Sequence, residues 1–87
     1  MYAIEKVNSI DQYEEVLYFM VRMEYYYLRH SMTIEEMEHA LNMIYDKDID
    51  LEGYTYLISR GKLFDVLIML EKEVGNIKFV KELEGEY

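Results

Sequence analysis

Three aspartates at alternate positions, Asp46, Asp48 and Asp50, are the residues in this sequence that come nearest to a metal-binding pattern. Alternate acids begin an EF-hand calcium loop, where their carboxylate oxygens surround one ion. The rest of that loop is missing, because its sixth position is Leu51 instead of glycine and its twelfth is Leu57 instead of glutamate. We therefore predict no calcium site.

A second pattern, Glu36 followed by His39, matches the Glu-x-x-His pairing that helix bundles use to hold two iron ions. Such sites need a second copy of the pair and two further glutamates. The other histidine, His30, has Tyr27 three residues before it. The sequence therefore predicts no metal site and no cofactor.

Nucleophiles for catalysis are few. The chain has no cysteine, and its serines and threonines are limited to five, at least two of which fit helix caps: Ser9, Ser31, Ser59, Thr33 and Thr55. They assemble neither a triad nor a glycine-rich phosphate loop. We predict no catalytic residues and a protein that is not an enzyme.

Acidic residues gather in one segment. Residues 35–52 hold seven acids and one lysine, while the whole chain has a formal charge of -9. One interpretation is a patch that meets a basic partner, formed by Glu35, Glu38, Asp46, Asp48, Asp50 and Glu52. The alternative is a solvated helix face and loop that only keep the protein soluble.

Tyrosine and arginine form a second candidate surface. Tyrosine occurs ten times, and Tyr18, Arg22, Tyr25 and Arg29 lie three or four residues apart, with Tyr26 beside them. These two residue types are enriched at protein-binding hot spots. The stripe therefore predicts partner binding or self-association; the alternative is that the rings lie on the surface and share cation–π contacts with the arginines.

Size and composition indicate a single helical domain over residues 1–87. The chain is 52% hydrophobic, so it can fill one small core. Its acidity disfavours direct binding to nucleic acid or to anionic membranes and favours a basic protein partner. The absence of cysteine, of a leader-like segment at residues 1–15 and of an apolar run long enough to span a bilayer favours the cytoplasm.

Capping boxes and glycines predict where the helices begin and end. Ser9 with Gln12 and Thr33 with Glu36 mark two starts, and Gly61 and Gly75 mark two ends. We expect helices over residues 10–29, 34–45, 51–60, 62–74 and 77–84, with a loop at 46–50 and the last helix capped by Asn76.

Periodicity predicts the buried faces. The first helix should bury Tyr13, Val16, Leu17, Met20, Met23 and Tyr27; the second Ile34, Met37, Leu41 and Ile44; the fourth Leu63, Val66, Leu67, Leu70 and Val74, extended by Phe64 and Ile68. In the second helix, Glu35, Glu38, His39 and Asn42 should face water. The first and fourth helices should form most of the core.

The predicted fold is an all-α compact bundle of four to five short helices. Residues 54–71 resemble one helix hairpin of the tetratricopeptide or pentatricopeptide type, but a single copy predicts no solenoid. In size, charge and class the chain is similar to bacteriocin immunity proteins, antitoxins and phage-encoded inhibitors. That similarity implies a non-catalytic inhibitor of a basic partner, with a nucleic-acid-processing protein as one such partner; the alternative is a homodimer or larger homo-oligomer formed through the tyrosine and arginine stripe.

Overall fold

Five α-helices and one short 3-10 helix follow one another in residues 10–85, the part of the chain that the computed structural model describes; the side chains of Ile10, Ile77, Phe79 and Leu83 fall outside the description. The helices are α1 (Ile10–Leu28), α2 (Ile34–Tyr45), the 3-10 helix η1 (Glu52–Tyr54), α3 (Thr55–Ile58), α4 (Leu63–Glu73) and α5 (Ile77–Leu83). The described residues contain no strand. The predicted all-α bundle is confirmed.

Local signals set most of the helix ends. Thr33 and Glu36 form the predicted capping box, because Glu36 N donates to Thr33 Oγ1 at 3.2 Å and Thr33 N donates to Glu36 Oε1 at 2.9 Å. Gly61 and Gly75 adopt φ angles of 73° and 84°, which most side chains avoid, and reverse the chain after α3 and α4. The capping box predicted at Ser9 lies outside the described residues.

The predicted third helix over residues 51–60 is wrong in its extent. A 3-10 turn forms first, where Tyr54 N donates to Leu51 O at 2.9 Å, and only one turn of α-helix follows. Asp50 Oδ1 accepts from Glu52 N at 2.9 Å, which draws the chain into this tight turn. Gly53 at its centre weakens a regular α-helix further.

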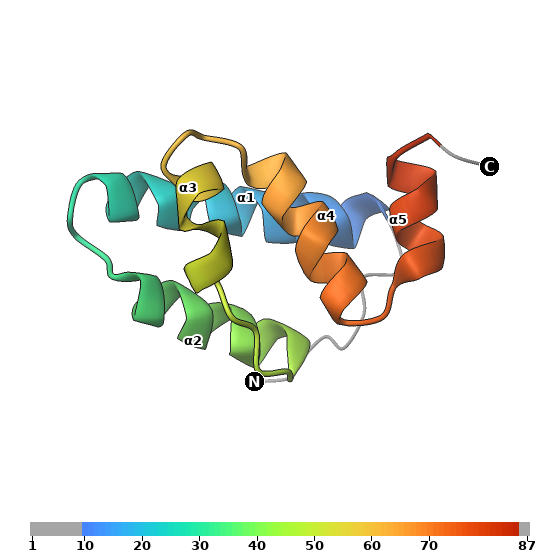
Figure 1. Cartoon of the computed structure of the whole chain (residues 1–87), viewed down its shortest axis with the longest axis horizontal. Helices are drawn as coiled ribbons and strands as arrows, with labels where there is room; N and C mark the ends of the chain where they lie inside the picture. The colour runs from blue at the N-terminus through green and yellow to red at the C-terminus, as the bar shows by residue number, and fades with distance from the viewer. Residues whose placement is uncertain (1–9, 86–87) are drawn as a thin grey trace.

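Helix α4 is the centre of the bundle. It packs against α1, α3 and α5, and Figure 1 shows it crossing in front of α1. α2 lies along the lower side of this view, and α5 lies at the opposite end of the molecule from the turn that joins α1 to α2. The two helices expected to form most of the core, α1 and α4, are in direct contact.

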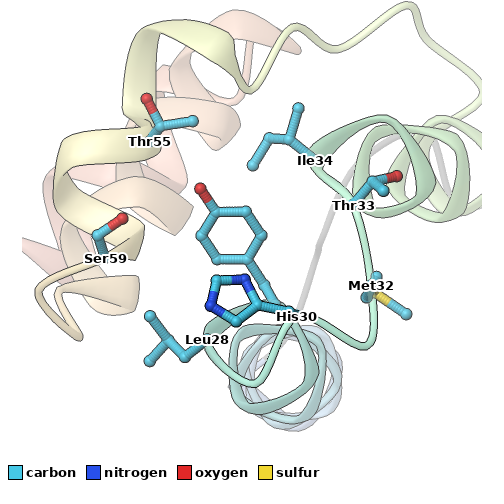
Figure 2. Close-up of a pocket in the computed structure, with 8 residues that line it drawn as sticks. Leu28, His30, Met32, Thr33, Ile34, Thr55 and Ser59 are labelled. Carbon is cyan, nitrogen blue, oxygen red and sulfur yellow. The ribbon is translucent and has the colours of Figure 1, made fainter.

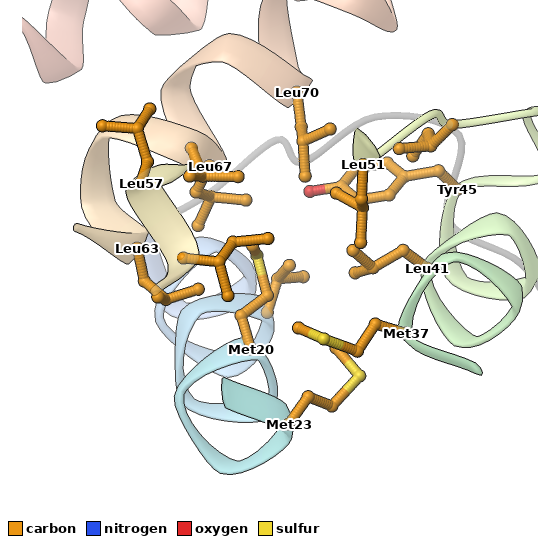
Figure 3. Packing of buried hydrophobic residues seen from close by; sticks show 14 of the residues in the cluster. Met20, Met23, Met37, Leu41, Tyr45, Leu51, Leu57, Leu63, Leu67 and Leu70 are labelled. Carbon is orange, nitrogen blue, oxygen red and sulfur yellow. The ribbon is translucent and has the colours of Figure 1, made fainter. Parts of the chain in front are cut away.

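Methionines and leucines fill the space where α1, α2 and α4 meet. Figure 3 shows Met20 and Met23 of α1 facing Met37 and Leu41 of α2 under the leucines of α4. Full burial of one such side chain contributes about 1.5–3 kcal/mol. The predicted core positions of α1 and α4 are buried or half-buried with the exception of Phe64, and those of α1 include Tyr13 and Tyr27.

The loop after α2 folds back onto that helix, and four side chains of α2 lie differently from the predictions. Ile49 and Leu51 enter the core, and their backbone N–H groups donate to Asn42 Oδ1 (2.5 Å) and Glu38 Oε2 (2.8 Å). Glu38 and Asn42 are therefore half-buried and do not face water as expected. Tyr45, whose hydroxyl donates to Glu71, is fully buried, while Ile34 and Ile44, expected in the seam, are only half-buried at the margin of the core.

Phe64 is also placed differently from the prediction. Its side chain is 47% exposed instead of extending the buried face of α4, and its ring meets Tyr13 edge-on with the centroids 5.8 Å apart. Ile68, the other expected extension, is buried. The Phe64 ring thus packs against the buried Tyr13 ring at the margin of the core.

Candidate functional site

The outward face of α1 carries a regular tyrosine and arginine stripe. Tyr18, Arg22, Tyr25 and Arg29 recur at intervals of four, three and four, so they share the side of the helix opposite its buried methionines. Tyr18 is 67% exposed and Tyr25 is 56% exposed. Together with Tyr26, these are the five residues predicted as an aromatic face, and the structure brings them together.

The arginines of this stripe lie over the rings of the tyrosines. The guanidinium carbon of Arg29 is 4.7 Å from the ring centre of Tyr25, and that of Arg22 is 6.0 Å from the ring centre of Tyr18. Tyr25 and Tyr26 also meet edge-on at 5.7 Å. Such contacts restrict long side chains, so less side-chain freedom is lost when a partner binds.

Apolar side chains flank the stripe on both sides. Of the nine large hydrophobic residues exposed in the described part of the chain, six belong to α1: Tyr18, Phe19, Val21, Tyr25, Tyr26 and Leu28. A groove of about 360 Å³ runs beside them, with Phe19 and Ile44 on its walls and Glu15 and Arg22 at its rim. We call this surface, formed by these residues with Arg22 and Arg29, the α1 outer face.

The predicted acidic patch is divided by the structure. Glu35, Asp46, Asp48 and Glu52 are exposed. Glu38 and Asp50 are already engaged inside the protein, since their carboxylates accept hydrogen bonds from the backbone of Leu51 and Glu52. A shallow depression of about 470 Å³ lies where α2 ends, with Asp46, Asp48 and His39 among its lining residues.

No acid of residues 35–52 has a cation within ion-pair distance among the residues that the structure describes. The ion pair found within residues 10–85 lies elsewhere and joins Lys72 Nζ to Glu84 Oε2 at 4.0 Å. The exposed carboxylates of the patch therefore keep their negative charge unpaired and available to a cationic group in solution.

The two patterns considered for metals form no metal-binding group in the described residues, where no three histidine or acidic side chains are placed to share an ion. Asp46 adopts a left-handed conformation at the end of α2, with a φ angle of 54°. Glu36 is committed to the capping box with Thr33. One residue of each pattern, Asp46 and Glu36, therefore serves an end of α2.

A buried carboxylate that the sequence reasoning missed lies between α2, α4 and α5. Glu71 is 0% exposed, and it accepts hydrogen bonds from the Tyr45 hydroxyl at 2.6 Å and from Asn76 Nδ2 at 3.0 Å. Asn76 was expected to cap α5; its side chain makes no capping hydrogen bond and binds Glu71 instead. Position 71 continues the spacing of Leu63 and Leu67 by four, and this signal could have revealed its burial.

Burial is the largest cause of the raised pKa values of Glu71, Tyr45 and the nearby Tyr13. It raises the pKa of Glu71 above its ordinary value, and the hydrogen bonds from Tyr45 and Asn76 offset part of that rise. Burial also raises the pKa of Tyr45 strongly, with the hydrogen bond to Glu71 as a second cause. Burial and the charges of Glu71 and Asp65 raise the pKa of Tyr13 to about 12. The cluster is closed to solvent, so we assign it to the stability of the fold.

A pocket of about 580 Å³ lies at the turn between α1 and α2. Figure 2 shows Thr55 and Ser59 of the α3 region on one side, Ile34 at the start of α2 on the other, and Leu28 and His30 below them. His30 has a φ angle of 61°, which turns the chain sharply after α1. The Thr55 hydroxyl donates to Glu52 O at 3.1 Å, so part of the polar lining serves the local fold.

The fold and these surfaces define a small all-α bundle with two contrasting exposed regions. No family model, curated protein or solved structure matches the chain. None of the helices within residues 10–85 has the length and apolar character needed to cross a membrane.

Proposed function

We propose that this protein is a non-catalytic protein-binding module and that the α1 outer face is its contact surface. The observation that carries the proposal is the gathering of six exposed hydrophobic side chains on one helix. Single exposed apolar residues are normal on any protein, but a contiguous group of them typically marks an interaction site.

The chemistry of the face supports the same proposal. Tyr18, Tyr25 and Tyr26 combine a large apolar ring with a hydroxyl, so they stay soluble when free and bury area when bound. Arg22 and Arg29 are held against two of these rings. Rigid aromatic anchors next to arginine form the typical centre of a protein interface.

A photo-crosslinking experiment tests this proposal. Benzoylphenylalanine at position 25 should form a covalent adduct with another protein chain in the native cell, whereas the same group at position 56 should not. The two positions are matched, because Tyr25 is 56% and Tyr56 is 55% exposed and only Tyr25 lies on the α1 outer face. Equal labelling from both positions, or none from position 25, would refute the proposal.

A second candidate function is the sequestration or inhibition of a basic protein by the acidic patch, as in an immunity protein, an antitoxin or a phage anti-defence protein. The absence of internal ion pairs for the acids of residues 35–52, within the described chain, favours it. Attraction between opposite charges would speed the encounter and weaken with salt.

Amide substitutions test the acidic patch without disturbing the fold. Asp46→Asn, Asp48→Asn and Glu52→Gln remove three exposed charges, while Glu38 and Asp50 are left intact because they bond to the backbone. Affinity capture at low and moderate salt, followed by mass spectrometry, should recover less of a basic partner with this variant. Unchanged recovery would rule out the patch as the binding surface.

A further inference from the structure

Charges follow a regular order along the exposed side of α1. Asp11, Glu14 and Glu15 are exposed in its first third, and Arg22 and Arg29 are exposed in and just after its second half. The remaining acid of the helix, Glu24, is half-buried with its Oε2 atom shielded from solvent. The outward side of α1 is thus acidic at one end and basic at the other.

A surface of this kind is complementary to itself when turned end to end. We propose that two copies of the chain pair through the α1 outer face, with their α1 helices antiparallel about a twofold axis near the level of position 20. This inference rests on the proposed function, because it names the partner of the same surface. In a twofold interface every contact occurs twice, so a favourable pairing is doubled.

The register follows from the spacing of the charges. An axis at position 20 sets Asp11 of one copy opposite Arg29 of the other, since the two positions lie nine residues on either side. The same axis sets Tyr18 opposite Arg22 of the second copy, where the guanidinium can cover the ring as Arg22 already does within one chain. Both pairs join groups that attract.

The groove beside α1 fits the same register. Tyr25 of one copy comes opposite Glu15 of the other, at the rim of the groove of about 360 Å³ whose walls include Phe19. The Tyr25 ring can enter this groove while its hydroxyl donates to the Glu15 carboxylate. A parallel pairing would instead set Asp11 against Asp11 and Arg29 against Arg29, and both contacts would repel.

The net charge of -9 on each chain opposes association, but little of it lies on this surface. The outward side of α1 has two arginines and three acids, while the densest acids belong to α2 and the following loop. At physiological ionic strength, charges more than about 8 Å apart are largely screened. Contacts within the interface therefore decide the outcome.

The face is small, which sets the expected strength of the dimer. From position 11 to position 29 a helix extends about 27 Å, and with side chains it is about 10–12 Å wide. One such face buries less area than a standard protein interface. We therefore expect monomer and dimer to exchange, with the dimer populated between about 10 μM and 1 mM.

Charge reversal in the full chain tests the proposal. Sedimentation velocity should show the wild type moving toward twice the monomer mass over that concentration range. Asp11→Arg places two arginines opposite each other across the interface, and Arg29→Asp places two aspartates there. Each variant alone should dimerise about tenfold more weakly, because two attractive pairs become repulsive. An equimolar mixture of the two variants should recover association, because in the mixed dimer both contacts between positions 11 and 29 again join an arginine to an aspartate.

Glu35→Arg and Arg60→Asp are matched controls, because they make the same charge changes at exposed positions outside α1 and should leave association unchanged. Circular dichroism verifies that every variant is folded. A wild type that stays monomeric at about 1 mM, or single variants that dimerise like the wild type, would overturn the proposal. A crosslink from position 25 to a different protein would overturn it too, yet would leave the proposed function standing.

Discussion

The buried carboxylate of Glu71 yields a prediction in which the sign and the pH dependence both follow from the structure. The perturbation is Glu71→Gln, which removes the charge but keeps the shape of the side chain. The Gln oxygen can still accept from the Tyr45 hydroxyl, now 2.6 Å from Glu71 Oε1, and its NH₂ group can donate to the Asn76 side-chain oxygen after that amide turns over.

The sign of the stability change follows from the direction in which the pKa of Glu71 is shifted. Burial raises the pKa of Glu71 in the folded state above its ordinary value of 4.5, so the folded protein holds this proton more tightly than the unfolded chain does. The corresponding stability is present in full below the unfolded pKa. It is lost as the pH rises through the folded pKa, with a slope that cannot exceed about 1.4 kcal/mol per pH unit.

The magnitude comes from two opposing contributions. Burying an ion costs several kcal/mol, and two hydrogen bonds to the carboxylate each return about 1.5–3 kcal/mol. Because the net shift is upward, the cost exceeds the return. We therefore expect Glu71→Gln to be more stable than the wild type at pH 7 by about 1–3 kcal/mol, and the difference to shrink as the pH is lowered.

Urea unfolding followed by circular dichroism at several pH values measures this difference. Glu82→Gln is the control, since it removes one negative charge from an exposed position and should show little of the effect. If Glu71→Gln proves less stable than the wild type by an amount independent of pH, then the hydrogen bonds outweigh burial and the reasoning fails.

Three further predictions concern single features of the fold. Thr33→Ala removes the hydroxyl that accepts from Glu36 N and should lower the free energy of unfolding in urea by about 1 kcal/mol, while Thr33→Ser should change it little. Gly75→Ala should destabilise the protein by about 1 kcal/mol because of its φ angle of 84°, whereas Gly53→Ala, with a φ angle outside the positive range, should not; thermal unfolding compares the two. Tyr13 and Tyr54 have pKa values raised to about 12, Tyr54 through burial and its hydrogen bond to Glu73, so the stability they add should be full below pH 10 and lost toward pH 12; ultraviolet absorbance should show both ionising late.

The helices that sequence alone predicted well are those with local signals. α2 begins at the predicted residue because Thr33 and Glu36 cap each other three positions apart, and it ends as predicted before Asp46, which adopts a left-handed conformation. α4 differs by one residue at each end, and Gly75 closes it as expected. Capping and glycine reversal depend only on neighbouring residues, so they can be read without knowledge of the fold.

The errors arose where distant segments meet. The half-burial of Glu38 and Asn42 depends on the loop at residues 46–51 folding back onto α2, and the hydrogen bonds from this loop to the two residues span 13 and 7 positions. Periodicity within α2 contains no information about that loop. The exposed position of Tyr18 and Tyr25, in contrast, follows from helical spacing alone and was predicted.

Glu71 and the α1 outer face are the two places where polar and apolar groups depart from the usual pattern, one by burying a charge and the other by exposing rings. Departures of this kind are expected at functional or strained sites. A general shortage of polar residues would have scattered the exposed rings over all helices, yet six of the nine exposed large hydrophobics in the described residues belong to α1.

The two departures are carried by different elements, so they should respond to substitution independently. Tyr25→Ala should weaken association and leave the urea midpoint nearly unchanged, because its ring is 56% exposed. Glu71→Gln should shift the midpoint and leave association unchanged, because the side chain is closed to solvent. Sedimentation and urea unfolding of both variants separate the effects. If Glu71→Gln altered association as well, the core cluster and the α1 outer face would have to be coupled through α4, which contacts α1 directly.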